Sequence, residues 1–198
     1  MTYLVRNAVK EDAKEMAILI NYAGTSPRNR GLDIIGWEAA AEDGEDGFDY
    51  GAGIVSSEDD LFSYNNIRVV EVDGKIAAMS LCYETFRRTP EQMQQIHEHL
   101  RIFKELTNTI PGEFYLDSLA VLPDYRGQGY GRIMLEDSVE KARMLGYSVI
   151  YLIAFTENVA GVSLYEKKGF IKVMTKTSSG HPDLPYSGEV VLYRKDIR

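Results

Sequence analysis

The amino-acid sequence predicts a single α/β domain, and three observations support that prediction. Stretches with the apolar pattern of strands alternate along the chain with stretches of helical apolar spacing. The pair Asp73-Gly74, between two apolar runs, is a strong signal for a two-residue hairpin turn. The chain has 198 residues, 44% of them hydrophobic, with neither an internal repeat nor a Pro- or Ser-rich linker. That length fits one domain with a sizeable core, spanning residues 1–198.

The first half of the chain predicts three strands and an insert. Residues 3–7 alternate as an opening strand. A helix follows, and its buried face is marked at helical spacing by Ala13, Met16, Ala17 and Ile20. Residues 25–66 form an insert that mixes acidic, aromatic and glycine residues, in which we expect only a short helix near 33–41. Residues 69–72 and 76–83 then pair across the Asp73-Gly74 turn.

The second half predicts helices with recognisable ends. Thr89 and Gln92 form a capping box, with Pro90 at the first helical position. One helix should follow, because Met93, Ile96, Leu100 and Phe103 recur at helical spacing. Strands are expected at 114–121, 149–155, 170–175 and 189–193. Two further helices lie between them, one ending at Gly146 and one running from Asn158 to Gly169.

The most informative segment is Leu119-Ala-Val-Leu-Pro-Asp-Tyr-Arg-Gly-Gln-Gly-Tyr-Gly131, a strand and a glycine-rich loop that opens a helix. Glycines let backbone N–H groups approach an anion closely, and a helix N-terminus adds unpaired N–H groups. Together they predict a pyrophosphate site. A P-loop is excluded, because Arg132 and Ile133 stand where Lys-Ser/Thr is required. A dinucleotide site is excluded, because the spacing is G-x-G-x-G and the strand 149–155 carries no carboxylate.

A second block, Asn158-Val-Ala-Gly-Val-Ser-Leu-Tyr-Glu-Lys-Lys-Gly-Phe170, lies downstream. Arg126-x-x-Gly129-x-Gly131 followed by this block resembles the GNAT superfamily of acetyl-CoA-dependent N-acetyltransferases. The resemblance is specific over residues 113–176, plausible over 1–24 and 67–84, and uninformative over 25–66. It implies a mixed, mainly antiparallel central sheet of about six to seven strands flanked by helices.

The resemblance also implies residues for the acetyl-CoA site. In that superfamily the loop holds the pyrophosphate of coenzyme A, and the preceding strand pairs with the pantetheine arm. Carried over, the cofactor-binding residues are Leu119, Ala120, Val121, Arg126, Gly127, Gln128, Gly129, Tyr130, Gly131, Asn158 and Tyr165. Either Arg126 or Arg132 would meet a phosphate oxygen. Asn158 has a second interpretation as a helix cap, and Tyr165 as a packing residue.

Two catalytic roles follow. Tyr165 resembles the superfamily's general acid, which protonates the departing thiolate of coenzyme A. An alkylamine of pKa about 10.4 must also lose a proton, at a cost of roughly 4.6 kcal/mol at pH 7. Asp117 is the first candidate for that base, because similar enzymes often use this strand position, although the carboxylate could be purely structural. The alternatives are Tyr115 through a water molecule, Glu84 and His181.

The net charge of −8 argues against nucleic-acid binding. Eight acidic residues lie between Glu42 and Asp60 with no Lys or Arg among them. This run is either a solvated loop or an electrostatic funnel for a cationic acceptor. No window approaches 18 apolar residues, so no membrane span is expected. The single cysteine, Cys82, excludes an internal disulfide framework, and a cytoplasmic location is expected.

We therefore expect an enzyme that transfers an acetyl group from acetyl-CoA directly to an amine of a small molecule. The alternatives are a protein or peptide N-acetyltransferase and a non-catalytic acetyl-CoA sensor. No metal is expected, because His97 and His99 lie two apart and should not share a helix face. The oligomeric state stays open, a homodimer included.

Overall fold

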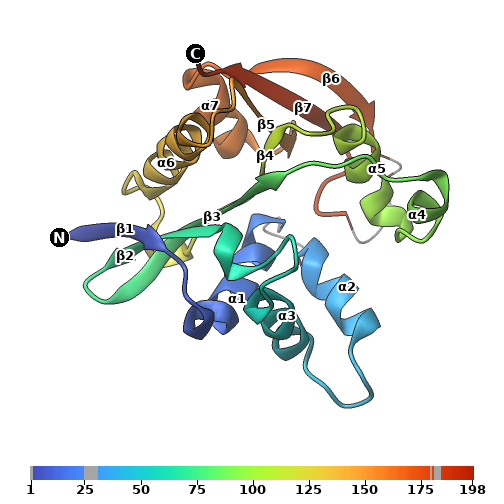
Figure 1. Cartoon of the computed structure of the whole chain (residues 1–198), viewed down its shortest axis with the longest axis horizontal. Coiled ribbons are helices and arrows are strands. Elements are labelled where there is room, and N and C mark those ends of the chain that lie inside the picture. Colours follow the sequence, from blue (N-terminus) through green and yellow to red (C-terminus); the bar gives the residue numbers. More distant parts are fainter. Residues whose placement is uncertain (1, 25–30, 179, 181–183) are drawn as a thin grey trace. The chain divides into compact units, whose positions relative to one another are not determined.

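The structure is a computed structural model that describes residues 2–24, 31–178, 180 and 184–198. Its strands form a seven-stranded mixed sheet in the order β1-β2-β3-β4-β5-β7-β6 (Figure 1). They are β1 (Tyr3–Asn7), β2 (Ile67–Val72), β3 (Lys75–Glu84), β4 (Phe114–Val121), β5 (Val149–Phe155), β6 (Ile171–Thr177) and β7 (Glu189–Asp196). Adjacent strands are mostly antiparallel, and β4 pairs with β5 in parallel. The predicted fold class is confirmed.

Helices accompany the strands along the chain. They are α1 (Ala13–Ala23), α2 (Leu32–Ala40), α3 (Gly47–Ser56), α4 (Pro90–Gln94), α5 (Glu98–Thr107), α6 (Tyr130–Met144) and α7 (Val159–Lys167). Short 3-10 turns η1 (Lys10–Asp12), η2 (Tyr64–Asn66) and η3 (Pro123–Tyr125) complete the described elements. No helix in the described part of the chain has the length and apolar character that crossing a membrane requires.

The chain forms two compact units. Unit 1 comprises residues 1–82 and 117–138, and unit 2 comprises residues 83–116 and 139–198. The strands β3 and β4 and the helix α6 each contribute residues to both units.

In unit 1, a hairpin and the start of α6 form an apolar cluster. β1, β2 and β3 are antiparallel, and the turn between β2 and β3 has positive φ at Asp73 (49°) and Gly74 (78°). These angles are those of a type I′ turn, and they fit the two-residue hairpin turn that the sequence predicts. The buried members of the cluster are Val70, Val72, Ala77, Ala78, Tyr130 and Met134. The glycine-rich loop therefore leads into a helix that is anchored on this hairpin.

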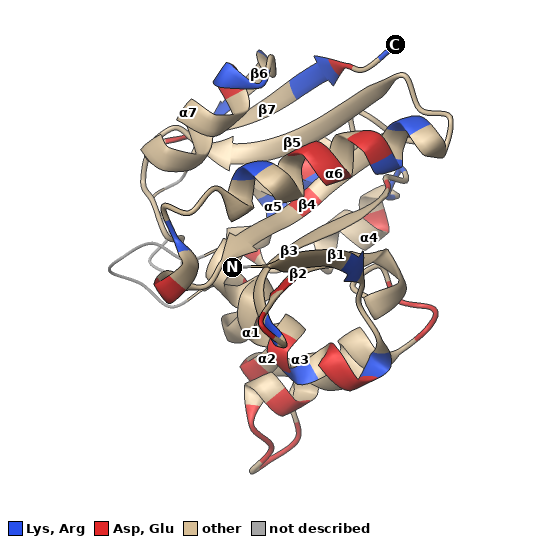
Figure 2. Ribbon diagram, turned by 90° about the vertical axis from the view of Figure 1, so that its left-hand side faces the viewer, with Lys and Arg blue, Asp and Glu red and all other residues tan. Residues whose placement is uncertain are grey.

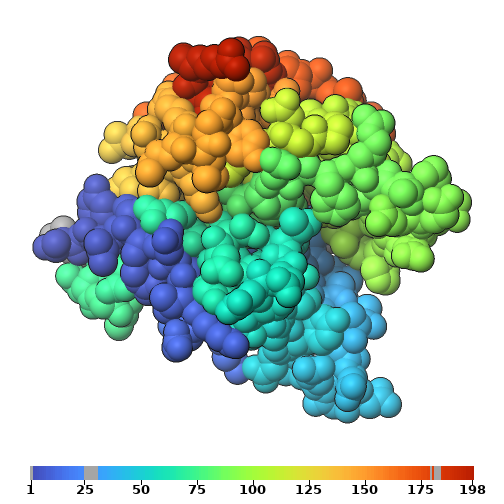
Figure 3. Space-filling view, in the orientation of Figure 1, coloured from blue at the N-terminus to red at the C-terminus, as the bar shows by residue number. Residues whose placement is uncertain are grey.

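The insert of unit 1 contains one helix more than the sequence predicts. α2 matches the helix expected near 33–41, and α3 follows it, packed against α1 and α2 (Figures 1 and 3). The side chain of Asp46 caps α3 by accepting hydrogen bonds from the backbone N–H groups of Phe48 and Asp49. A Cβ at Gly51 would lie 2.5 Å from the Trp37 ring. Glycine, a poor helix former by itself, thus permits close contact between the two helices.

In unit 2, the parallel pairing of β4 with β5 covers Phe114–Leu116 and Ile150–Leu152. β7 lies between β5 and β6 and is antiparallel to both. Helix α7 ends at Lys167, and Gly169 (φ 84°) follows it as the predicted glycine cap, with the N–H of Phe170 donating to the carbonyl of Tyr165. This is the hydrogen bonding of a glycine C-cap.

The single helix expected after Thr89 is wrong. The capping box at Thr89 is present, but α4 ends at Gln94 and a separate helix, α5, begins at Glu98. His97 has a non-helical backbone (φ −50°, ψ 140°) and occupies the N-cap position of α5 without a side-chain capping hydrogen bond. The second helix therefore presents a different face, in which His99, Leu106 and Thr107 are buried.

Candidate functional site

The glycine-rich loop of unit 1 has the backbone of an anion site. Gly127 and Gly129 adopt φ of 75° and 89°, and a Cβ at either would meet no atom within 4 Å. This open space lies over exposed backbone, so a ligand can approach it. Two side chains hold the loop in shape: Arg126 Nε donates to the carbonyl of Val121 (3.1 Å), and Gln128 Nε2 donates to that of Asp124 (3.0 Å).

The donors of this loop are available. Within the described residues, the N–H groups of Gly127, Gln128 and Gly129 donate no hydrogen bond. The N–H of Ile133 donates to the carbonyl of Gly129 (3.1 Å) at the start of α6, the helix that the loop is predicted to open. The first N–H groups of a helix have no intrahelical acceptor and attract anions. The loop therefore fits a diphosphate group such as that of coenzyme A.

The strand before the loop presents two different faces. Leu119 and Val121 are half-buried and pack against the apolar cluster under α6, whereas Ala120 is buried and points to the opposite face by strand alternation. Tyr130 is buried in that cluster, so its side chain serves packing while its N–H belongs to the first turn of the helix. Arg132 is exposed and forms an ion pair with Glu136 (3.9 Å).

Asp117 lies on the same strand face as Leu119 and Val121, at the start of the unit 1 part of β4. Its carboxylate is half-buried and accepts a hydrogen bond from Ser118 Oγ (2.9 Å). A carboxylate in this position can accept a proton from an amine, directly or through water. Unit 1 thus contains both the diphosphate candidate and the first base candidate.

Tyr165 lies in unit 2, on α7, with only 8% of its surface exposed. Its ring contacts Phe170 edge-on (centroids 6.1 Å apart) and lies 6.4 Å from the ring of Tyr193 on β7. Burial, with a smaller contribution from Tyr193, raises the pKa of the Tyr165 hydroxyl to about 12. Tyr165 is therefore held protonated, the state that a hydrogen-bond donor or acid requires.

The other predicted residues of unit 2 have structural partners. The side chain of Asn158 caps α7 by accepting from the N–H of Gly161 (3.1 Å), as its alternative interpretation predicts. Tyr115 is buried edge-on against Tyr83 (centroids 5.7 Å apart). The carboxylate of Glu84, a further alternative base, accepts a hydrogen bond from the Tyr147 hydroxyl. The remaining alternative, His181, lies outside the described residues.

Within the described residues, no group of three or more His, Cys, Asp or Glu side chains could hold a metal ion. The rings of His97 and His99 lie 5.8 Å apart, because His97 precedes α5 and does not follow its helical spacing.

The sequence did not predict two features, one beside Tyr165 and one on α6. The hydroxyl of Tyr193 is buried and has no hydrogen-bond partner among the described residues. Its strand reads only as apolar core, and nothing in the sequence pairs it with Tyr165. The second feature is a double hydrogen bond between Arg68 and Asp137, which are 69 residues apart in the sequence.

The chain resembles known acetyltransferases in sequence and in fold. The ribosomal protein bS18-alanine N-acetyltransferase of Escherichia coli (strain K12) is 35% identical over 65 residues, which are 33% of this chain and 44% of that relative. The match thus spans less than half of the relative's length. A solved structure described as an acetyltransferase is 24% identical, with a TM-score of 0.64 over 98% of this chain and 100% of its own.

A second solved structure is that of yncA from Salmonella typhimurium with its cofactor acetyl-CoA. It is 15% identical, with a TM-score of 0.63 over 100% of this chain and 95% of its own. These structures share the fold. The sequence profile of the acetyltransferase (GNAT) family matches residues 38–170, more than half of the chain. The protein therefore belongs to the acetyltransferase (GNAT) family.

Proposed function

We propose that this protein is an N-acetyltransferase that moves an acetyl group from acetyl-CoA directly to the α-amino group of a protein or peptide. The observation that carries the donor assignment is the loop 126–131, with its positive-φ glycines and available N–H groups at the start of α6. Family membership supports the same donor.

In the proposed reaction, the loop N–H groups and Arg126 or Arg132 bind the phosphates, and the backbone of Leu119 and Val121 binds the pantetheine arm. The neutral amine nitrogen attacks the thioester carbonyl carbon, and a backbone N–H near Val121 supports the oxyanion. The carbon–sulfur bond then breaks, and the electron pair leaves with sulfur. Asp117 accepts the ammonium proton before the attack. The proton that the attacking nitrogen loses as the amide forms passes to the departing sulfur, to which the Tyr165 hydroxyl donates a hydrogen bond. No acyl-enzyme is needed, and the buried Cys82 lies outside these motifs.

Two arguments favour a protein α-amine as acceptor over the small-molecule amine expected first. The curated relative acts, by its name, on an alanine of a ribosomal protein. An α-amine has an ordinary pKa of about 7.7–8.0, so freeing it at pH 7 costs roughly 1 kcal/mol, against roughly 4.6 for an alkylamine. A single half-buried carboxylate such as Asp117 then suffices as base.

The expectation of a small-molecule acceptor depended on the aromatic and acidic residues of the insert. The positions of these residues in the structure weaken that expectation. Trp37 is buried against Gly51 in the contact between α2 and α3, so its ring serves the core. The acidic side chains between Glu42 and Asp60 are exposed, on and around α3 (Figure 2). The insert therefore presents an acidic surface more than an aromatic pocket. An acidic surface suits any cationic acceptor, a peptide included.

The test measures coenzyme A release with peptides that carry a free N-terminal alanine, with the same peptides blocked at the N-terminus, and with polyamines and aminoglycosides. We expect turnover on the free peptides and none on the blocked ones. Turnover confined to the small molecules would overturn the protein acceptor. Binding of acetyl-CoA without acetylation of any amine would count against the proposed transfer and favour the acetyl-CoA sensor. Asp117→Asn should lower turnover at unchanged coenzyme A affinity, and unchanged turnover would remove Asp117 as the base.

A further inference from the structure

Helix α6 is held on the unit 1 hairpin by apolar contacts, which set its distance from the strands. Tyr130 and Met134, one turn apart, are buried against Val70 and Ala78. Burial of this kind stabilises the contact but is non-directional. Apolar packing alone therefore leaves rotation and sliding of the helix weakly determined.

A directional contact is present two turns into α6. Arg68 on β2 donates through Nε to Asp137 Oδ2 and through Nη2 to Asp137 Oδ1, both at 2.9 Å. The two side chains are mostly buried, at 24% and 19% exposure. A planar guanidinium that binds a carboxylate through two parallel hydrogen bonds allows little rotation of either partner.

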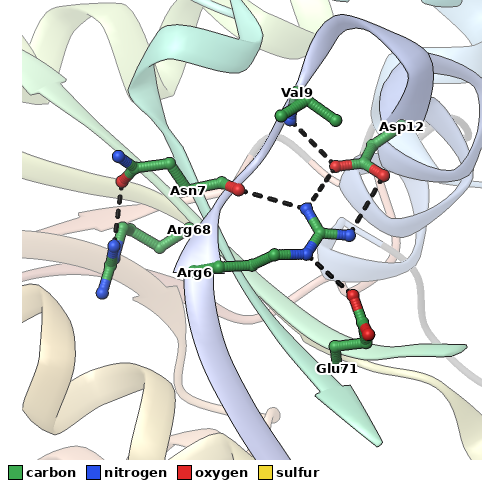
Figure 4. Close-up of polar contacts among 6 residues, drawn as sticks. All are labelled: Arg6, Asn7, Val9, Asp12, Arg68 and Glu71. Carbon is green, nitrogen blue, oxygen red and sulfur yellow. Dashed lines mark hydrogen bonds and ion pairs between the residues drawn. The ribbon is translucent and has the colours of Figure 1, made fainter. Parts of the chain in front are cut away.

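Arg68 is itself positioned by neighbouring polar groups. Its Nη1 donates to Asn7 Oδ1 (2.9 Å), and the carbonyl of Asn7 accepts from Arg6 Nη1 (3.1 Å) (Figure 4). Arg6 in turn binds Asp12 and Glu71. The guanidinium that receives Asp137 thus belongs to a network that joins β1, β2 and η1.

The same helix carries the loop. Asp137 is seven residues after Tyr130, so the two lie on one face, about 10 Å apart along the helix axis. The other end of the loop is attached to the hairpin, since the N–H of Leu122 donates to the carbonyl of Ala77 (2.9 Å). The direction of the N–H groups at Gly127–Gly131 therefore depends on where α6 is held.

We propose that Arg68 and Asp137 are positioning residues for the diphosphate end of coenzyme A. Their double hydrogen bond fixes the rotation of α6 about its axis and its position along that axis. In this position the loop N–H groups converge on the diphosphate. This inference rests on the proposed acetyl-CoA function. A displacement of about 1 Å at such a site is enough to weaken it, because hydrogen bonds lose strength quickly with distance and angle.

The test compares binding of coenzyme A with binding of pantetheine, which lacks the diphosphate and nucleotide, by calorimetry on the full chain. For Asp137→Asn and Arg68→Lys, we expect coenzyme A affinity to fall about tenfold or more and pantetheine affinity to stay within twofold. The matched control is Glu140→Gln, which removes an exposed ion pair with Arg143 on the same helix and should change neither. Thermal unfolding reports whether each variant is folded.

A folded variant with unchanged coenzyme A affinity would overturn the inference, and so would equal losses for coenzyme A and pantetheine. If the single variants do not fold, the double variant Arg68→Met with Asp137→Leu removes both charges and keeps apolar packing. We expect it to fold and still bind coenzyme A about tenfold more weakly, and wild-type affinity would contradict the proposal. Failure of the wild-type protein to bind coenzyme A would instead overturn the proposed function.

Discussion

Tyr165 shows how burial suits a side chain for one chemical step. Its ring is enclosed by Phe170 and Tyr193, and burial raises its pKa to about 12. A thiol has an ordinary pKa of about 8.5, so complete proton transfer from such a group to a thiolate is uphill by roughly 5 kcal/mol. We therefore expect the hydroxyl to stabilise the departing thiolate mainly by donating a hydrogen bond to it.

The first prediction follows from that role. Tyr165→Phe keeps the ring and removes the donor, so kcat should fall roughly 10- to 100-fold, the effect of a hydrogen bond to a charged group. Acetyl-CoA affinity should stay within twofold of the wild type. Steady-state kinetics and calorimetry measure the two quantities, and an unchanged kcat would exclude Tyr165 from the chemistry.

The second prediction concerns stability at alkaline pH. The folded state holds the Tyr165 proton up to a pKa of about 12, whereas the unfolded state releases it near the ordinary value of 10.0. The unfolded state therefore binds fewer protons between these values, and the free energy of unfolding falls as pH rises from about 10 to about 12. The full contribution is present below pH 10.

In Tyr165→Phe, the free energy of unfolding should lack the part of this decline that Tyr165 causes. That part amounts to roughly 3 kcal/mol over the whole range from about pH 10 to about pH 12. Denaturant unfolding at pH 9 and pH 11 measures the part of this decline that falls below pH 11, roughly 1.4 kcal/mol, as a difference between variant and wild type. The difference cancels the contributions of other tyrosines such as Tyr147. Parallel curves for the two proteins would contradict the raised pKa.

At the scale of elements, α3 depends on its contacts more than on its own sequence. Gly47, Gly51 and Gly53 lie in it, and glycine costs a helix about 1 kcal/mol relative to alanine. The cap at Asp46 and the packing of Gly51 on Trp37 compensate for that cost. This is why the sequence predicted α2 but not α3.

The third prediction uses two glycines of this helix as a matched pair. Gly51→Ala should destabilise the protein by about 1–3 kcal/mol, because the new Cβ would overlap the Trp37 ring. Gly53→Ala meets no atom within 4 Å and should stabilise by about 0.4–1 kcal/mol. Urea unfolding measures both. Stabilisation by both substitutions would show that the α2–α3 contact is not tight.

At the scale of the whole molecule, charge is unevenly distributed. Unit 1 has 19 acidic and 9 basic residues, whereas unit 2 has 11 acidic and 13 basic. The net negative charge therefore belongs to unit 1, where the insert contributes eight acids between Glu42 and Asp60. A surface of this kind attracts cationic acceptors, and salt screens it beyond about 8 Å at physiological ionic strength.

The fourth prediction is that kcat/KM for a cationic peptide falls with salt. Replacing Glu42, Asp43 and Asp59 with their amides should lower kcat/KM at low salt about two- to tenfold and flatten its salt dependence. These positions are chosen because the helix cap at Asp46 and the ion pair of Asp49 with Lys14 stay intact. A peptide without cationic side chains serves as control. Equal salt dependence for both peptides would leave the acidic run as a solvated surface.

We also propose that the two units unfold as the single domain that the sequence predicts. β3, β4 and α6 each run from one unit into the other, so neither unit can lose its structure without breaking an element of the other. The fifth prediction is one calorimetric transition whose van't Hoff and calorimetric enthalpies agree. Two separate transitions would contradict it.

The sequence by itself determined the features that are encoded locally. The loop at Gly127–Gly131, the type I′ turn at Asp73-Gly74 and the glycine cap at Gly169 follow from backbone preferences of a few adjacent residues. The order of helices and strands follows from apolar periodicity, and the family follows from two motifs. These properties need no knowledge of distant contacts.

Only the tertiary structure decided the rest. It showed α3, the break between α4 and α5, the burial of Tyr165 against Tyr193, and the pairing of Arg68 with Asp137. Each of these depends on side chains brought together from separate segments of the chain. Local propensity does not report such contacts, because their energies arise only when the segments pack.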